Sequence, residues 1–233
     1  MINTVKNSRY LWKIVNWFNK PISEKAKSII WNYLDLRSYL FEKKYSLDFK
    51  GDIPNTEIVT ESKSSILNSL GYQAISTYSF IILMEEAIKI LAERPQNYFI
   101  DIGCGKGKPC IYAKKYFKFK QIIGIDFSKP LIDTANKNLK NTQYTNIVFT
   151  VADGVEWKLP DEFCVVFLHN PFNGIILEKF IVNNLNNFRI YNSIVVYAYD
   201  LEKDVLLNLG FETLYRNWKY SIYMFKSNLQ ISK

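Results

Sequence analysis

"FIDIGCGKGKPC", residues 99–110, decides the fold, because an apolar run ends there in three closely spaced glycines. Glycines at such a place let the backbone turn tightly and approach a ligand. A phosphate loop requires GxxxxGK[ST], and a dinucleotide fingerprint requires GxGxxG. The phosphate-loop pattern fails because Lys108 stands five residues after Gly103. The dinucleotide fingerprint fails because its third glycine would stand at Lys108. The spacing G-x-G-x-G instead favours a ligand that has no pyrophosphate.

Apolar runs and helical patterns alternate along the chain around this turn. The predicted strands are 98–103, 121–126, 146–153, 163–170 and 192–200, and the predicted helices are 73–93, a segment reaching to about 117, 130–140, 173–185 and 201–209. Strands that are apolar throughout are buried on both faces, as in a parallel sheet covered by helices. The alternation therefore predicts an α/β, doubly wound fold.

Two further predicted strands, 211–216 and 219–226, close the chain and are joined by only two residues. A parallel pair needs a long crossover connection, so one strand of this pair must be antiparallel to the rest. We therefore predict seven strands, mostly parallel, with an antiparallel strand in the terminal hairpin.

The first fifty residues differ in charge from the rest of the chain. Residues 1–50 carry +6 of the net charge of +8. The spacing of apolar and aromatic residues predicts amphipathic helices at 9–19 and 22–45. The favoured interpretation is that the aromatic stripe packs on the main domain and the lysines are solvated. Two alternatives stay open: peripheral membrane contact by 9–45 and a basic surface for nucleic acid.

The main domain is predicted to span 51–233, and its polar first part, 51–72, is predicted to be an entry loop or lid. Cys104, Cys110 and Cys164 form no CxxC pair and no even set, which disfavours a disulfide framework or a zinc site. No secretory signal and no run of membrane-spanning length is recognised. These features favour a reducing, cytoplasmic location.

Three acids stand at the ends of three successive predicted strands. In an open α/β sheet the ligand lies beyond these carboxyl ends. Asp101 can contact a cationic amino group, and Asp126 can accept hydrogen bonds from both hydroxyls of a ribose. Asp153, followed by Gly154, can accept from an adenine amino group. S-adenosylmethionine offers all three groups. The alternative is that these acids only cap helices or turns.

Four segments together resemble motifs I to IV of the class I S-adenosylmethionine-dependent methyltransferases. They are "FIDIGCGKGKPCIYAKK" (99–115), "IIGIDFSKPLIDTANKN" (122–138), "FTVADG" (149–154) and "VVFLHNPF" (165–172). The resemblance is greatest to a group of small bacterial methyltransferases with a (Y/F)NPF motif IV. It also covers "NTEIV" at 55–59 and "YQAIST" at 72–77, although Ala74 stands where that group has proline.

This resemblance implies a Rossmann-like sheet, S-adenosyl-L-methionine as cofactor and no metal. The cofactor-binding residues that it and the strand ends together indicate are Asp101, Gly103, Cys104, Gly105, Gly107, Asp126, Phe127, Asp153, Gly154, Asn170, Tyr72 and Thr56. Lys106 and Lys108 are interpreted as solvated charges at the start of a helix.

"HNPF", residues 169–172, resembles the [DNS]-P-P-[YFW] motif of amino-group methyltransferases, with one proline missing. The resemblance implies that Asn170 orients the nucleophile and that Phe172 forms one wall of its site. His169, the only histidine of the chain, could act as a general base. Strand alternation, however, points it away from Asn170 unless the chain has already turned. A purely structural role of these residues in a turn stays open.

The predicted activity is methyl transfer to a nitrogen of a protein lysine, a terminal amine or a small amine. One alternative is an O-methyltransferase acting on a small molecule or glycan. The others are a cofactor-binding module without catalysis and a nucleic-acid methyltransferase. No carboxylate cluster accompanies motif IV, which disfavours a metal-dependent enzyme.

Overall fold

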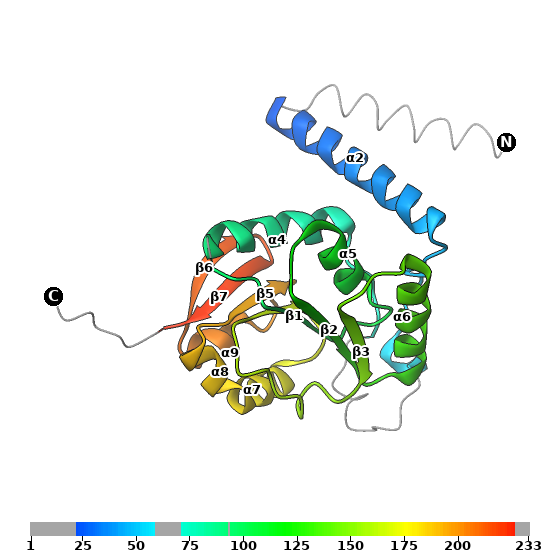
Figure 1. The fold of residues 1–233 in the computed structure, drawn as a ribbon. Coiled ribbons are helices and arrows are strands. Elements are labelled where there is room, and N and C mark those ends of the chain that lie inside the picture. The colour runs from blue at the N-terminus through cyan, green and yellow to red at the C-terminus, as the bar shows by residue number, and fades with distance from the viewer. Residues whose placement is uncertain (1–21, 59–70, 93, 227–233) are drawn as a thin grey trace. The chain divides into compact units, whose positions relative to one another are not determined.

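The computed structural model describes residues 22–58, 71–92 and 94–226 (Figure 1). The chain divides into two compact units, Met1–Lys43 and Lys44–Lys233. In the first unit the described element is most of helix α2, Ile22–Lys44. The helix predicted at 9–19 lies outside the described residues. No helix among the described ranges is both long and apolar enough to span a bilayer.

The described part of the second unit contains one seven-stranded sheet, in the order β3-β2-β1-β4-β5-β7-β6 (Figure 1). Five strands run parallel, and β7 pairs antiparallel with both β5 and β6. The predicted fold is therefore confirmed. The strands are β1 (Tyr98–Ile102), β2 (Gln121–Asp126), β3 (Ile147–Val151), β4 (Cys164–His169), β5 (Ile194–Ala198), β6 (Phe211–Asn217) and β7 (Tyr220–Phe225).

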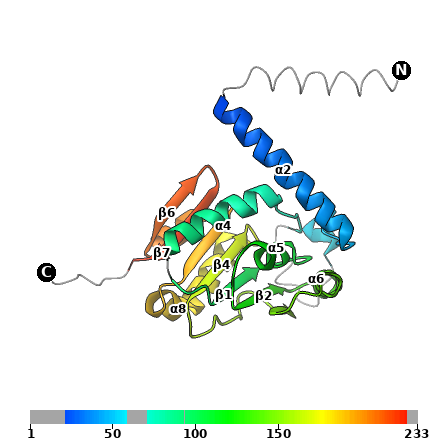
Figure 2. The ribbon, with the colours of Figure 1, turned by 45° about the horizontal axis from the view of Figure 1, so that its top comes forward.

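Helices cover both faces of this sheet (Figures 1 and 2). One face carries α4 (Thr77–Leu91), α5 (Lys108–Tyr116) and α6 (Lys129–Thr142), and the other carries α7 (Gly174–Asn183), α8 (Leu185–Ile190) and α9 (Lys203–Asn208). The short helix α8 was not predicted as a separate element. Pro109 and Pro130 stand in the first turns of α5 and α6, where a missing N–H leaves no helical bond unmade.

Helix α4 begins later than the sequence predicts, and the difference matters for the site. The side chain of Ser76 caps the helix by accepting a hydrogen bond from the N–H of Ser79. Gln73 and Ala74 therefore stay outside the helix and are available to line a cavity. The buried face of α4 is held by Phe80, whose ring meets that of Phe167 edge to face at 5.3 Å.

The register of the parallel strands aligns their carboxyl ends along one edge of the sheet. Asp101 pairs with Gly124 and Phe167, and Asp126 pairs with Val151. The polar residues at the strand ends consequently lie at a single edge, where an open α/β sheet binds its ligands.

Candidate functional site

Two cavities adjoin at the carboxyl edge of the sheet. The first has a volume of about 190 Å³ and the second about 230 Å³. Both are lined by Gly103, Asp126, Phe127 and Pro171. The first is also lined by Ile58, Gly71, Tyr72, Gln73, Ala74, Ile75, Asp101, Cys104, Lys108, Pro109, Leu131, His169, Asn170 and Tyr199, and the second by Ile102, Ile125, Ala152, Asp153, Gly154, Val155, Glu156, Phe172, Ile176 and Lys179. An elongated ligand can occupy the two cavities together.

The glycine loop follows β1, and its first glycine, Gly103, lines both cavities. Gly103, Gly105 and Gly107 have φ values of +78°, +53° and +79°, a region that side chains rarely adopt. A Cβ at Gly103 would lie 2.6 Å from the Cβ of Pro171, and one at Gly105 would lie 2.4 Å from the ring of Tyr72. The loop thus needs glycine for conformation and for close packing, and it presents the backbone of Gly103 to both cavities.

Asp126, at the end of β2, joins the glycine loop to the sheet. Its two carboxylate oxygens accept hydrogen bonds from the backbone N–H groups of Gly105 and Ser128, each at 2.9 Å. Burial raises the pKa of this carboxyl to about 6, and the two backbone hydrogen bonds act in the opposite direction. A carboxylate oxygen can accept more than one hydrogen bond. Asp126 can therefore also receive the two hydroxyls of a ribose placed where the cavities adjoin.

Asp101 is almost fully buried, with 1% of its surface exposed, and it lines the first cavity. Burial and the nearby charge of Asp126 raise its pKa well above the ordinary value. Its described contact is with the thiol of Cys110, at 3.8 Å. An approaching ammonium group would favour the ionised form of this buried acid. The residue is thus suited to a ligand with an amino group.

Asp153, for which the sequence predicts a hydrogen bond from an adenine amino group, lines the second cavity together with Gly154. One oxygen of Asp153 accepts a hydrogen bond from the N–H of Val155 at 2.9 Å. A Cβ at Gly154 would lie 2.8 Å from Ile102, so the wall is flat at this point because glycine occupies it. Asp153 can therefore cap its turn through the bond to Val155 and still offer its carboxylate to a ligand in the second cavity.

The chain turns directly after β4, and this turn decides how motif IV is presented. Asn170 has a φ of +46°, which breaks the strand alternation. His169 and Asn170 consequently both line the first cavity. The hydroxyl of Tyr197 contacts the side-chain oxygen of Asn170 at 3.4 Å. Phe172 differs from the expectation, since it lines the second cavity and not the first.

His169 is held in an unprotonated state by its surroundings. Burial lowers the pKa of its imidazole to about 4, and a hydrogen bond with the backbone of Gln73 acts in the opposite direction. Its ring lies 5.6 Å from that of Tyr199, centroid to centroid. The imidazole of His169 is therefore a neutral ring that lines the first cavity at physiological pH.

The predicted entry loop, 51–72, contributes Ile58, Gly71 and Tyr72 to the described lining of the first cavity. Tyr72 is 9% exposed, forms an isolated bridge with Ile53, and donates its hydroxyl proton to the carbonyl of Phe49. Thr56 lies in the 3₁₀ turn η1, Asn55–Glu57, and is exposed. It is not among the described residues that line either cavity.

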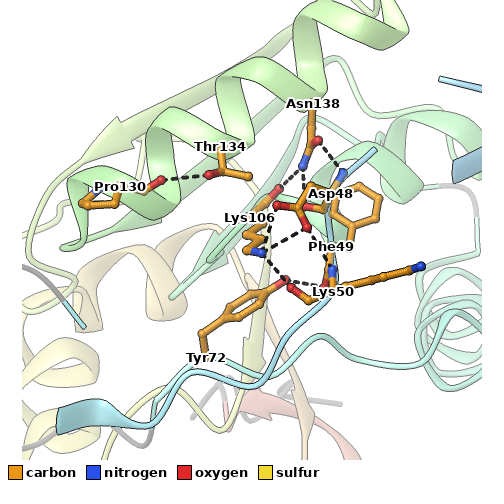
Figure 3. Close-up of polar contacts among 8 residues, drawn as sticks. All are labelled: Asp48, Phe49, Lys50, Tyr72, Lys106, Pro130, Thr134 and Asn138. Carbon is orange, nitrogen blue, oxygen red and sulfur yellow. Dashed lines mark hydrogen bonds and ion pairs between the residues drawn. The ribbon is translucent and has the colours of Figure 1, made fainter. Parts of the chain in front are cut away.

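Residues 44–50, which the sequence assigned to the N-terminal helices, belong to the second unit. Figure 3 shows how they are fastened to the glycine loop. The side chain of Asn138 accepts from the N–H of Asp48 at 2.9 Å and donates to the carbonyls of Asp48 and Lys106 at 2.9 and 3.0 Å. Asn138 is 1% exposed, and its buried amide joins the backbone of Asp48 to that of Lys106 in the glycine loop.

Lys106 is not the solvated charge that the sequence predicts. Its side chain is 11% exposed, and its ammonium contacts the carboxylate of Asp48 at 3.1 Å and donates to the carbonyl of Lys50 at 2.6 Å. It also lies 5.6 Å from the ring centroid of Tyr72 (Figure 3). Lys106 therefore binds residues 48–50, which we call the covering segment, whereas Lys108 lines the first cavity.

Tyr199 and Lys108 are cavity residues that the sequence argument missed. Tyr199 directly follows β5, so its position at the carboxyl end of a parallel strand was the available signal. Lys108 stands in the first turn of α5, and that place does not by itself tell which way a long side chain points. The described residues contain no group of three His, Cys, Asp or Glu that could hold a metal ion.

We predict that Lys106→Met loosens the covering segment without unfolding the sheet. The substitution keeps the length of the side chain and removes its contacts with Asp48 and Lys50. Amide hydrogen exchange at Ile53 and Tyr72, which bond each other at 2.9 and 2.8 Å, should accelerate. Exchange within β1 should stay unchanged. Lys129→Met, which breaks an exposed pair, is the matched control, and equal effects of the two would contradict the prediction.

Comparisons with known proteins agree with this geometry. Residues 99–182 match a family model described as a methyltransferase domain. The chain is 42% identical over 65 residues to a tRNA (guanine-N(7)-)-methyltransferase of Pediococcus pentosaceus. That match covers 28% of this chain and 30% of the enzyme, so the chain spans less than a third of the curated relative that it matches.

Comparison with solved structures finds similarity at low sequence identity. A structure from a study of the conversion of a disulfide bond into a thioacetal group during echinomycin biosynthesis has 14% identity and a TM-score of 0.50, covering 64% of this chain and 82% of the other. A ribosomal protein L11 methylase of Lactobacillus delbrueckii subsp. bulgaricus has 17% identity and a TM-score of 0.48, covering 66% and 81%. Residues 99–182 thus match a methyltransferase domain, a domain whose cofactor is S-adenosylmethionine, and they lie within a sheet that has the Rossmann-like strand order.

Proposed function

We propose that the protein transfers the methyl group of S-adenosylmethionine to a nitrogen atom of its acceptor. The observation that carries the proposal is the shared turn after β4, which brings Asn170 and a neutral His169 to the same cavity as the buried Asp101. The finer resemblance, to small bacterial methyltransferases with a (Y/F)NPF motif, belongs to the same proposal.

The residues present fit the cofactor along both cavities. The flat, partly apolar second cavity with Asp153 suits the adenine ring, and Asp126, at the boundary of the two cavities, suits the ribose hydroxyls. In the first cavity Asp101 suits the amino group and Lys108 the carboxylate of the methionine part. The acceptor would then enter the first cavity beside Asn170.

When bound, the cofactor supplies an electrophilic methyl group on a sulfonium. The new nitrogen–carbon bond forms as the carbon–sulfur bond breaks, which leaves S-adenosylhomocysteine and a proton on the methylated nitrogen for transfer to water. The side-chain oxygen of Asn170 can accept a hydrogen bond from the acceptor N–H and hold its lone pair in line. Tyr197, in contact with that oxygen, fixes its position.

Nitrogen is favoured over oxygen by the properties of His169. A neutral amine carries its own lone pair, whereas a hydroxyl acceptor needs a general base with a pKa near the working pH. A histidine with a pKa of about 4 is a weak base for that task. The proposed acceptors accordingly include a protein lysine, a terminal amine, a small amine or a ring nitrogen. Transfer to the oxygen of a small molecule or glycan is the second candidate.

We predict that Asn170→Gly lowers turnover about 100-fold, as expected when a positioning contact is lost. Glycine tolerates the φ of +46°, so the backbone is not strained by the change. Affinity for S-adenosylhomocysteine, measured by calorimetry, should change by less than threefold. A parallel loss of cofactor affinity and turnover would show that Asn170 only shapes the turn.

Cofactor affinity should depend on pH through Asp126. Its raised pKa of about 6 means that the free protein binds a proton there as the pH falls through 6. The protonated carboxyl accepts fewer hydrogen bonds, so the Kd for S-adenosylhomocysteine should rise about tenfold between pH 8 and pH 5. Asp126→Asn should bind more weakly at pH 8 and lose most of this dependence. An unchanged profile in the variant would contradict the assignment.

Lys108→Met should discriminate between cofactor fragments. We expect the affinity for S-adenosylhomocysteine to fall about tenfold, because a charge-assisted contact to the carboxylate is lost. 5′-Methylthioadenosine lacks that carboxylate, so its affinity should stay the same. Calorimetric titration of both ligands provides the measurement, and Lys129→Met is the control. Equal losses for both ligands would mean that Lys108 supports the cavity without contacting the carboxylate.

A further inference from the structure

A row of aromatic side chains leads from the first cavity to the surface. Tyr199 lines that cavity, and its ring lies 5.6 Å from His169, 5.3 Å from Tyr220 and 5.7 Å from Trp218, between centroids. Trp218 and Tyr220 are 6.1 Å apart. We call these four side chains, His169, Tyr199, Trp218 and Tyr220, the aromatic row. It begins beside Asn170 and ends at Trp218, which is 63% exposed.

A third cavity, of about 210 Å³, lies along the outer end of the row. It is formed between helix α4 and the hairpin of β6 and β7, which are neighbours in both ribbon views (Figures 1 and 2). Besides apolar atoms it offers hydroxyl and amide groups for hydrogen bonds. Its lining residues are Tyr78, Ser79, Ile82, Leu83, Tyr215, Asn217, Trp218 and Tyr220.

The backbone holds two of these rings in a conformation that is costly for large side chains. Tyr199 and Trp218 each have a φ of +57°, whereas bulky residues rarely adopt positive φ. Both stand at ends of strands where a glycine or asparagine would be free of strain. Such strain persists where the surrounding structure enforces it, and it gathers at functional sites. Here its effect is to aim one ring at the first cavity and the other at solvent.

The chemistry of the row favours a planar heterocycle over a cationic amine. The ammonium of Lys219 already lies 5.4 Å from the ring centroid of Trp218, and a second cation would be repelled by it. The same ammonium would attract a phosphate. Aromatic faces combined with a nearby cation are the combination that binds nucleotides through stacking and charge. Tyr220, whose pKa burial raises to about 12, remains a neutral hydroxyl.

We infer that the aromatic row and the third cavity bind a nucleobase-type heterocycle with an attached phosphate, as part of the methyl acceptor. The inference rests on the proposed methyl transfer, because it takes the first cavity as the place of reaction. The ring nitrogen or exocyclic amine would enter beside Asn170, while a base or sugar-phosphate group next to it would lie on Trp218 and near Lys219. A free nucleotide and an RNA strand both carry this chemistry.

The test is ligand binding to the full chain in the presence of S-adenosylhomocysteine. A fluorescently labelled, mixed-sequence single-stranded RNA 12-mer and, separately, each of the four nucleoside monophosphates would be titrated. We expect Trp218→Asn to weaken binding about fivefold or more, which is the range for loss of one stacked base. Asparagine tolerates the left-handed backbone, so folding should be kept. Trp218→Tyr should restore most of the affinity, and Lys219→Ala should reduce the dependence on salt.

Ile190→Ala, at an equally exposed apolar residue on α8, is the matched control and should leave binding unchanged. Tight binding of the 12-mer alone identifies a strand as the source of the heterocycle, and tight binding of a monophosphate identifies a free nucleotide. Binding of S-adenosylhomocysteine without either, or Trp218 variants equal to the parent chain, would overturn the inference. Failure to bind S-adenosylhomocysteine would instead overturn the proposed function.

Discussion

The two hydrogen bonds that Asp126 accepts hold the site together. One comes from Gly105 in the turn after β1 and the other from Ser128, which precedes α6. A single buried carboxylate thus fixes the glycine loop, the end of β2 and the start of the next helix relative to one another. The backbone N–H groups of Gly103 and Cys104 add two further bonds, both to the carbonyl of Ile125 in β2. Both cavities border on the carboxylate of Asp126.

The covering segment, residues 48–50, is held against the glycine loop by side chains from the loop and from α6. Asn138 and Lys106 hold residues 48–50, and Tyr72 lies over Gly105 because glycine leaves room for its ring. The covering segment and the glycine loop are therefore parts of one hydrogen-bonded assembly. This explains why a lysine inside a glycine-rich turn is turned away from the cavity.

The sequence was sufficient to predict the sheet, because apolar runs and glycine-punctuated turns are local signals. The acids at the ends of β1, β2 and β3 could be placed at one edge for the same reason. The direction of motif IV could not be predicted, since it depends on the φ of Asn170. The contact between Lys106 and Asp48 could not be predicted either, because the two residues are 58 positions apart and no local sequence pattern pairs them. The same turn geometry separates Phe172, which lines the second cavity, from Asn170, which lines the first.

Burial of the two cysteines at the glycine loop has a consequence for the reactivity of their thiols. Cys104 lines the first cavity and Cys110 lies against Asp101, and burial raises the pKa of both thiols well above the ordinary value. The thiolate, not the thiol, is the reactive nucleophile. Burial thus keeps both thiols in the protonated, weakly nucleophilic form beside the cavity that is proposed to hold the methyl donor.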